Sequence, residues 1–76
     1  MELMNRIVLN PDVLAGKPVI AGTRLSVQFI VGLLAKGMTN QDILNEYPYI
    51  EQDDIQACLL YASKSLDSSL FVPLAA

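Results

Sequence analysis

Histidine and tryptophan are absent from this sequence, and cysteine occurs only once, as Cys58. Without histidine no Ser-His-Asp or Cys-His catalytic set can form, and a single thiol leaves neither an internal disulfide nor a His/Cys metal cluster. Cys58 lies on a predicted apolar helix stripe, so we interpret it as a packed small hydrophobic residue rather than a nucleophile. The sequence therefore predicts a protein that is not an enzyme and that holds no metal or cofactor.

Basic residues are also scarce, with five Lys and Arg against eight Asp and Glu and a formal net charge of −3 at pH 7. This balance argues against a protein that coats nucleic acid electrostatically, although a local basic patch is compatible with it. Gly16-Lys17 and Gly22-Thr23 look like parts of a phosphate-binding loop. Pro18 follows Lys17 where such a loop needs Ser or Thr, so we expect no nucleotide site.

Long hydrophobic runs are missing as well. No apolar stretch approaches the roughly 18 to 20 residues that a membrane-spanning helix needs, and residues 1–5 lack the apolar core of a signal peptide. We expect a cytoplasmic protein without a membrane association.

What the sequence has in abundance is apolar surface. The chain is 53% hydrophobic over 76 residues, with a mean hydropathy of +0.40. A chain of this length forms one domain and buries only a modest fraction of its surface. The composition therefore predicts a homodimer or a hydrophobic partner.

The first quarter of the chain predicts a small N-terminal β-hairpin. A strand over 6–9 is stopped by the turn cluster at 10–12, and Val19-Ile20 after Pro18 forms its partner. Between them Asp12 can cap one helical turn that ends at Gly16. Gly22 suits a left-handed turn, after which residues 23–25 resume extended chain.

The remaining sequence predicts three helices. Ser26 caps the first, over 27–36, and Gly37 ends it; Thr39 caps the second, which Pro48 stops; the third runs from residue 51 or 52 to Leu66. The expected inner face of the third helix is Ile55, Cys58, Leu59, Ala62 and Leu66. We predict a mainly α protein, a three-helix bundle with a helix-turn-helix, formed by residues 1–66 and followed by an apolar tail over 67–76.

The first predicted helix carries two apolar stripes. Val27, Ile30, Val31 and Leu34 form the stripe that faces the core, while Phe29 and Leu33 form a second one. Two interpretations of the second stripe remain open: it contacts another chain, or the hairpin covers it. The tail residues Leu70, Phe71 and Val72 are likewise candidates for docking onto the protein's own dimer or onto a partner.

Three polar residues of the third helix could contact DNA. Gln52 and Gln56 can pair with adenine, and Lys64 is the only base on that helix, but Asp53 and Asp54 would repel phosphates. The residues support a bundle used for protein contacts at least as well. We expect Arg24 to act as a structural clamp on Asp54 or Asp42 in preference to a DNA contact.

The most specific pattern is the run Gly16-Lys17-Pro18-Val19-Ile20-Ala21-Gly22-Thr23-Arg24. With Asn10-Pro11, Gly37, Tyr47-Pro48 and Asp54-Ile55 it resembles the small bacterial domain-of-unknown-function family 433, whose members are similar to VapB-type antitoxins. The resemblance covers about 6–62. It implies a homeodomain-like bundle with a β-hairpin, a PIN-like ribonuclease toxin as partner, and binding to the protein's own promoter. Ser26 stands where many relatives have proline, and Ala21 where a basic residue is frequent, which lowers the expected DNA affinity.

The leading hypothesis is an antitoxin-like binding protein that sequesters a PIN-like nuclease and autoregulates by weak helix-turn-helix DNA binding. The alternatives are a transcriptional regulator without a toxin, and a dimeric interaction module without nucleic-acid contact.

Overall fold

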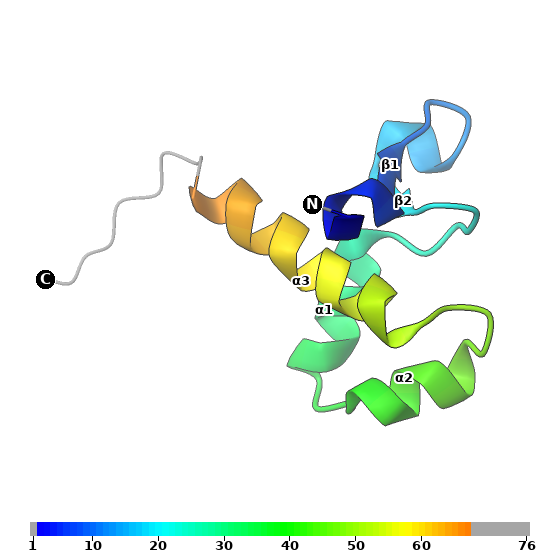
Figure 1. The fold of residues 1–76 in the computed structure, drawn as a ribbon, viewed down its shortest axis with the longest axis vertical. Coiled ribbons are helices and arrows are strands. Elements are labelled where there is room, and N and C mark those ends of the chain that lie inside the picture. Colours follow the sequence, from blue (N-terminus) through cyan, green and yellow to red (C-terminus); the bar gives the residue numbers. More distant parts are fainter. Residues whose placement is uncertain (1, 68–76) are drawn as a thin grey trace, which may run out of the picture.

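The computed structural model describes residues 2–67, and they form three α-helices and a two-stranded antiparallel sheet. Figure 1 shows the sheet at one end of the molecule, α2 at the other end, and α1 and α3 between them. The described chain is therefore mainly helical, as the sequence predicted. The elements in order are η1 (Glu2–Arg6), β1 (Ile7–Leu9), η2 (Leu14–Gly16), β2 (Pro18–Ile20), α1 (Val27–Ala35), α2 (Asn40–Glu46) and α3 (Gln52–Asp67).

The hairpin pairs β1 with β2 in the register Ile7↔Ile20, Val8↔Val19 and Leu9↔Pro18. Pro18 occupies the first position of its strand, where the missing N–H disrupts no inner ladder bond. The predicted pairing is confirmed, but the strand starts one residue later than expected because the short helix η1 runs through Arg6. The backbone N–H of Ala21 donates to the carbonyl of Arg6 at 2.8 Å and closes this junction.

The connection between the strands differs from the expected turn capped by Asp12. The short helix η2 covers Leu14–Gly16, and its N-cap residue, Val13, makes no side-chain cap. Asp12 instead donates its backbone N–H to Oδ1 of Asn10 at 2.9 Å, because the Asn10 side chain closes a local turn first. Leu14, Ala15 and Gly16 all have positive φ, which is a costly conformation for the first two.

The helix ends follow the local signals in the sequence. Oγ of Ser26 accepts the backbone N–H of Phe29 at 2.9 Å and begins α1. Thr39 and Asp42 form a reciprocal capping box at the start of α2, with both bonds at 3.0 Å. These hydrogen bonds lower the pKa of Asp42, with the backbone N–H of Thr39 as the main cause. The three predicted helices are therefore confirmed in place and order.

The core draws on almost every element. Its buried hydrophobic residues are Ile7, Val19, Ile20, Val27, Ile30, Ile43, Ile50, Ile55, Ala57 and Cys58. Cys58 is fully buried, which confirms its interpretation as a packing residue.

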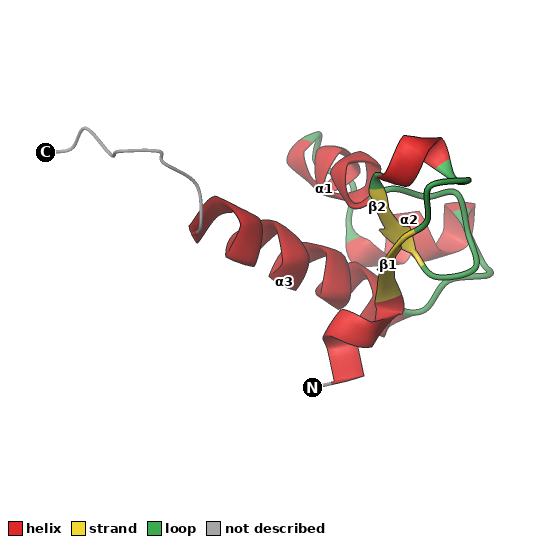
Figure 2. Ribbon diagram, turned by 90° about the horizontal axis from the view of Figure 1, so that it is seen from above, coloured by secondary structure: helices red, strands yellow, loops and turns green. Residues whose placement is uncertain are grey.

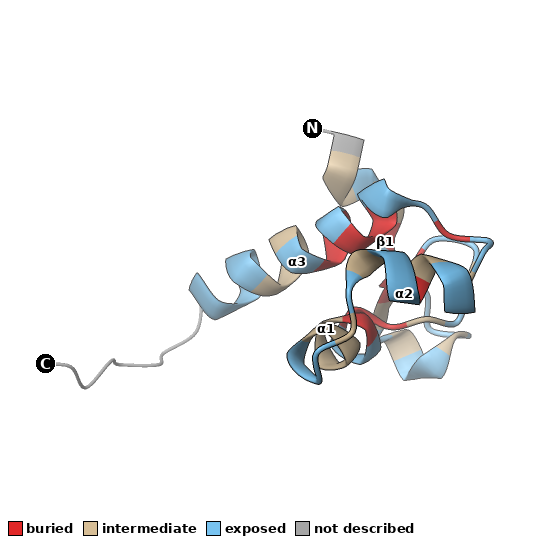
Figure 3. Cartoon of the chain, turned by 90° about the horizontal axis from the view of Figure 1, so that it is seen from below, coloured by how far each residue is buried: buried red, intermediate tan, exposed pale blue. Residues whose placement is uncertain are grey.

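The predicted inner face of α3 is wrong at two positions. Leu59 is 39% exposed and Leu66 is 71% exposed, whereas Ala57 is fully buried. The prediction assumed that the helix packs along its whole length. Instead α3 extends past the rest of the described chain at its C-terminal end (Figures 2 and 3), so Leu66 has no cover within residues 2–67, whereas Tyr61 and Ala62 still pack against the core.

A charge cluster ties the start of α3 to the hairpin. Nη1 of Arg6 lies 3.0 Å from Oδ1 of Asp54 and 3.0 Å from Oε1 of Glu51, and Nη2 lies 3.7 Å from Oδ2 of Asp53. The hydrogen bonds to Asp54 and then Glu51 raise the pKa of Arg6. Oδ2 of Asp54 also accepts the backbone N–H of Glu51 at 2.8 Å, so one carboxylate both caps α3 and holds Arg6.

The clamp predicted at Arg24 is therefore wrong. Arg24 is exposed, and within residues 2–67 the carboxylates proposed as its partners are engaged elsewhere, Asp54 by Arg6 and Asp42 by Thr39. Arg6 makes the predicted type of ion pair instead, because η1 packs against α3 and places the Arg6 side chain at the start of that helix.

No helix within residues 2–67 is long and apolar enough to cross a membrane. The predicted tail lies outside the described residues from position 68 onward, while Asp67 is the last residue of α3.

We predict that Arg6→Ala lowers the melting temperature by about 5 to 10 °C, because it leaves the buried Asp54 carboxylate without its cation. Arg24→Ala, which removes the same type of side chain from an exposed site, should leave the melting temperature unchanged. Thermal unfolding followed by circular dichroism measures both. An equal decrease in melting temperature in the two variants would show that Arg24 stabilises the fold as much as Arg6 does, and it would contradict this assignment.

Candidate functional site

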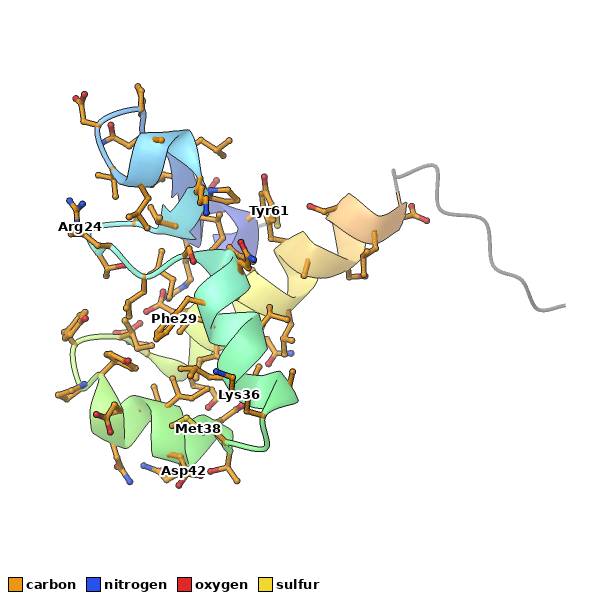
Figure 4. All side chains as sticks on the ribbon, turned by 180° about the vertical axis from the view of Figure 1, so that it is seen from behind. Arg24, Phe29, Lys36, Met38, Asp42 and Tyr61 are labelled. Atoms are coloured by element: carbon orange, nitrogen blue, oxygen red, sulfur yellow. The ribbon has the colours of Figure 1, made fainter. Side chains whose placement is uncertain are left out.

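Helix α1 presents two different surfaces. Val27 and Ile30 point into the core, which leaves the two flanks of the helix to meet other elements or solvent. In Figure 4 Phe29 and Tyr61 lie on opposite sides of α1, and each marks one flank. We describe the two flanks in turn.

The first flank, which we call the Phe29 face, consists of Phe29, Leu33, Tyr47, Tyr49, Lys17, Gln28 and Lys36. Its aromatic rings meet edge to face: the centroids of Phe29 and Tyr47 are 6.0 Å apart at 79°, and those of Tyr47 and Tyr49 are 6.3 Å apart at 83°. Such T-shaped contacts hold aromatic rings in fixed positions. Phe29 is still 41% exposed and Tyr49 is 64% exposed, so the ordered rings remain accessible.

The sequence left open whether the hairpin covers the stripe of Phe29 and Leu33, and the structure answers part of this question. Leu33 is half-buried against the core, and the ring contact to Phe29 comes from Tyr47, after α2, rather than from the hairpin. The second apolar stripe is therefore covered only in part within the described chain.

The Phe29 face also carries local positive charge. A hollow of about 380 Å³ beside it is lined by Lys17, Ser26, Gln28, Phe29, Gly32, Leu33 and Lys36. Two of the five basic residues of the chain thus lie beside the exposed ring of Phe29, in a protein whose net charge is −3. A complementary surface would be apolar at its centre and acidic at its edge.

The second flank is an apolar groove of about 540 Å³ between α1 and α3, which we call the α1–α3 groove. Val31, Gly32 and Ala35 line it from α1, and Tyr61, Ala62 and Leu66 line it from α3. A Cβ atom added to Gly32 would meet nothing within 4 Å, so the space above this residue is open. This groove was not expected from the sequence, because the helical spacing of Leu66 predicts a core residue, whereas Leu66 is exposed.

The residues proposed for DNA contact are not gathered at one place. Gln52 and Gln56 are both exposed and lie one turn apart at the start of α3, whereas Lys64 is about 18 Å from Gln52 along the helix at 1.5 Å per residue. The glutamines stand beside Glu51 and Asp53, whose side chains are 72% and 64% exposed. The guanidinium of Arg6 pairs with Glu51 and Asp54. These ion pairs compete with any contact between Arg6 and a phosphate beside the two glutamines.

The motif residues around the hairpin have structural positions. Gly16 and Gly22 adopt φ of +83° and +80°, and the hydroxyl of Thr23 donates to the carbonyl of Ile20 at 2.8 Å. Lys17 and Pro18 line the α1–α3 groove. The motif residues therefore form the turns of the chain next to α1 and line part of the groove there.

No group of three or more His, Cys, Asp or Glu side chains among residues 2–67 is arranged to hold a metal ion. Burial raises the pKa of Cys58 to about 12, with a smaller contribution from Asp54. The predicted partner-binding residues Leu70, Phe71 and Val72 lie outside the described residues.

Comparisons with known proteins find one matching family model. A family model described as "Protein of unknown function (DUF433)" matches residues 7–62. The uncharacterized protein y4eO of Sinorhizobium fredii (strain NBRC 101917 / NGR234) is 30% identical over 56 residues, which are 74% of this chain and 25% of that protein. The chain thus spans about a quarter of that relative.

A solved structure shares the fold. The crystal structure of a DUF433 member protein from Anabaena variabilis ATCC 29413 superposes with a TM-score of 0.79 at 28% sequence identity, over 86% of this chain and 64% of that one. The fold described above is therefore similar to an experimentally determined member of the same family.

We predict that Cys58 in the folded protein reacts with a thiol reagent such as DTNB only as fast as the protein unfolds, since the thiol is buried and its pKa is high. The matched control is Cys58→Ser combined with Ser63→Cys, which moves the single thiol to an exposed position of the same helix. This control should react at least tenfold faster in buffer and at the same rate in urea. Equal rates in buffer would show that Cys58 is accessible.

Proposed function

The chain belongs to the DUF433 family, and we propose that it is a non-enzymatic, antitoxin-like binding protein that captures a partner protein on the Phe29 face. In this proposal the helices form a homeodomain-like bundle, and the partner is a PIN-like nuclease, as the resemblance to VapB-type antitoxins implies. The chain spans 25% of the length of the y4eO protein and 64% of the crystallised chain. The proposal therefore concerns the region that this chain shares with them.

The observation that carries the proposal is the exposed aromatic cluster. Aromatic side chains are enriched at the centres of protein interfaces, where they bury a large area with little loss of side-chain freedom. Phe29 and Tyr49 are accessible, and the edge-to-face contacts through Tyr47 already order them. A partner would therefore pay little entropy to engage them.

The charges around this cluster describe the partner surface. Lys17 and Lys36 line the same hollow as Phe29 and Leu33. A nuclease surface with an apolar centre and carboxylates at its rim would match both features. A second copy of this chain docked through the same face would be a poorer electrostatic match, because Lys17 and Lys36 of one copy would face the same lysines of the other.

A homodimer remains the proposed state of the isolated protein. The exposed apolar residues Phe29, Leu59 and Leu66 support it, since a small domain rarely leaves so much apolar surface to solvent.

For partner binding, we predict that the product of the neighbouring gene, co-expressed with this chain, elutes with it, and that Phe29→Ser weakens the complex at least tenfold. Serine removes the central ring of the face while the core residues stay in place. Leu59→Ser is the control, because Leu59 is 39% exposed but lies outside the Phe29 face. Titration calorimetry compares the three proteins.

An equal loss of affinity in the Leu59→Ser control would contradict the assignment to the Phe29 face. Light scattering of the isolated chain at micromolar concentration distinguishes a homodimer from a monomer. If the chain is a monomer and its Phe29→Ser variant still loses affinity for the partner, the result supports the complex with the partner and contradicts the homodimer.

DNA binding is the second candidate function, and one observation favours it: Gln52 and Gln56 are exposed one turn apart at the start of α3. Their amides could read adenine in the major groove. The acidic neighbours Glu51 and Asp53 oppose phosphate contact, so any such binding is weak.

We predict that the affinity for promoter DNA falls only shallowly with salt, with a log–log slope of about −2 to −3, because the protomer has only five basic residues and few of them can contact phosphates at once. The double variant Gln52→Ala/Gln56→Ala should abolish sequence preference without changing this slope. Fluorescence anisotropy over a range of salt concentrations measures both. A tight complex with a steep slope that survives the double substitution would overturn this use of α3.

A further inference from the structure

We propose that the α1–α3 groove is the docking site of this chain's own residues 70–74, the sequence Leu-Phe-Val-Pro-Leu. The inference does not depend on the proposed function, which uses the aromatic rings of the Phe29 face; Lys17, Ser26, Gln28 and Gly32 lie between the two surfaces and line both.

The described part of α3 ends beside the groove. Leu66 lines the groove and is 71% exposed, and the next residue, Asp67, is the last of α3. Nine residues follow in the sequence. The segment that continues from α3 therefore starts at the rim of the groove, and its covalent attachment gives it an effective concentration in the millimolar range.

The length of residues 70–74 matches the length of the groove. The groove follows α3 from Tyr61 to Leu66, about 8 Å at 1.5 Å per helical residue, and it follows α1 from Val27 to Ala35, about 12 Å. Five extended residues span about 16 Å. Residues 70–74 can therefore cover the groove along both helices, with Ser68-Ser69 available for the reversal of direction.

The segment and the groove are chemically alike. The nine residues 68–76 carry no charged side chain, and all seven from Leu70 onward are apolar. The floor of the groove is equally apolar, formed by Val31, Ala35 and Ala62 beside the bare backbone of Gly32. Pro73 has no N–H, so it brings no donor that the groove would have to satisfy. A second folded domain would need an interface of about 1,000 Å² or more, whereas this groove fits a single extended strand of chain.

The test uses the absence of tryptophan from the sequence. Phe71→Trp and Val72→Trp each introduce a single indole into the full-length chain, and because successive side chains of an extended segment alternate, one of the two should enter the groove. We expect that variant to show blue-shifted emission and acrylamide quenching at least threefold slower than that of the other indole. Solvent-exposed emission from both variants would overturn the proposal.

Two substitutions locate the site. Ala35→Glu places a charge in the groove at an exposed residue, and it should return the protected indole to solvent-like emission and quenching. Ser63→Glu places the same charge on α3 outside the groove and should leave the emission unchanged. Circular dichroism verifies that both variants are folded. Unchanged protection in a folded Ala35→Glu variant would overturn the assignment to this groove.

Dilution distinguishes the chain's own groove from that of a second copy. Protection that is constant over a hundredfold dilution supports docking within one chain. Protection that disappears on dilution together with the dimer would overturn it and assign the segment to the groove of the other protomer.

Discussion

The ion pair between Arg6 and Asp54 is the contact on which the arrangement of this small protein depends. Asp54 is 8% exposed, and a carboxylate so far removed from water is stable only with a partner. Arg6 supplies the charge at 3.0 Å across 48 positions of sequence. Since Asp54 also accepts the N–H of Glu51, one side chain fixes both the start of α3 and the position of the hairpin. Helix α1 packs against α3 and β2, so its two flanks lie beside the elements that this ion pair joins.

Those flanks separate the charges and the apolar surface of the chain. The acidic residues Glu51 and Asp53 surround the start of α3, where a helix-turn-helix protein would meet DNA, while Lys17 and Lys36 flank the aromatic cluster at Phe29. This distribution favours contacts with protein over contacts with nucleic acid. It also explains why a chain with a net charge of −3 can present a locally basic surface.

The helix starts could be predicted from local signals in the sequence. The contacts that depend on long-range packing could not. Ser26 and the Thr39–Asp42 capping box act within four residues, so the sequence alone located both helix starts. The choice of Arg6 over Arg24 depended on η1, which carries no comparable signal. The exposure of Leu66 depended on how far α3 extends past its neighbours, which no periodicity reveals. The stripe of Phe29 and Leu33 was visible in the sequence, but the α1–α3 groove was not.

The central claim is that Arg6 and Asp54 stabilise the fold through each other, and a double-mutant cycle tests it most directly. The free energy of unfolding in urea, which leaves ion pairs unscreened, is measured for Arg6→Ala, Asp54→Ala, the double variant and the parent. Our account predicts that the double variant is clearly more stable than the sum of the two single losses implies, because either substitution alone leaves the other charge without its partner. Strictly additive losses would contradict the coupling and, with it, this account of how the hairpin and α3 are held together.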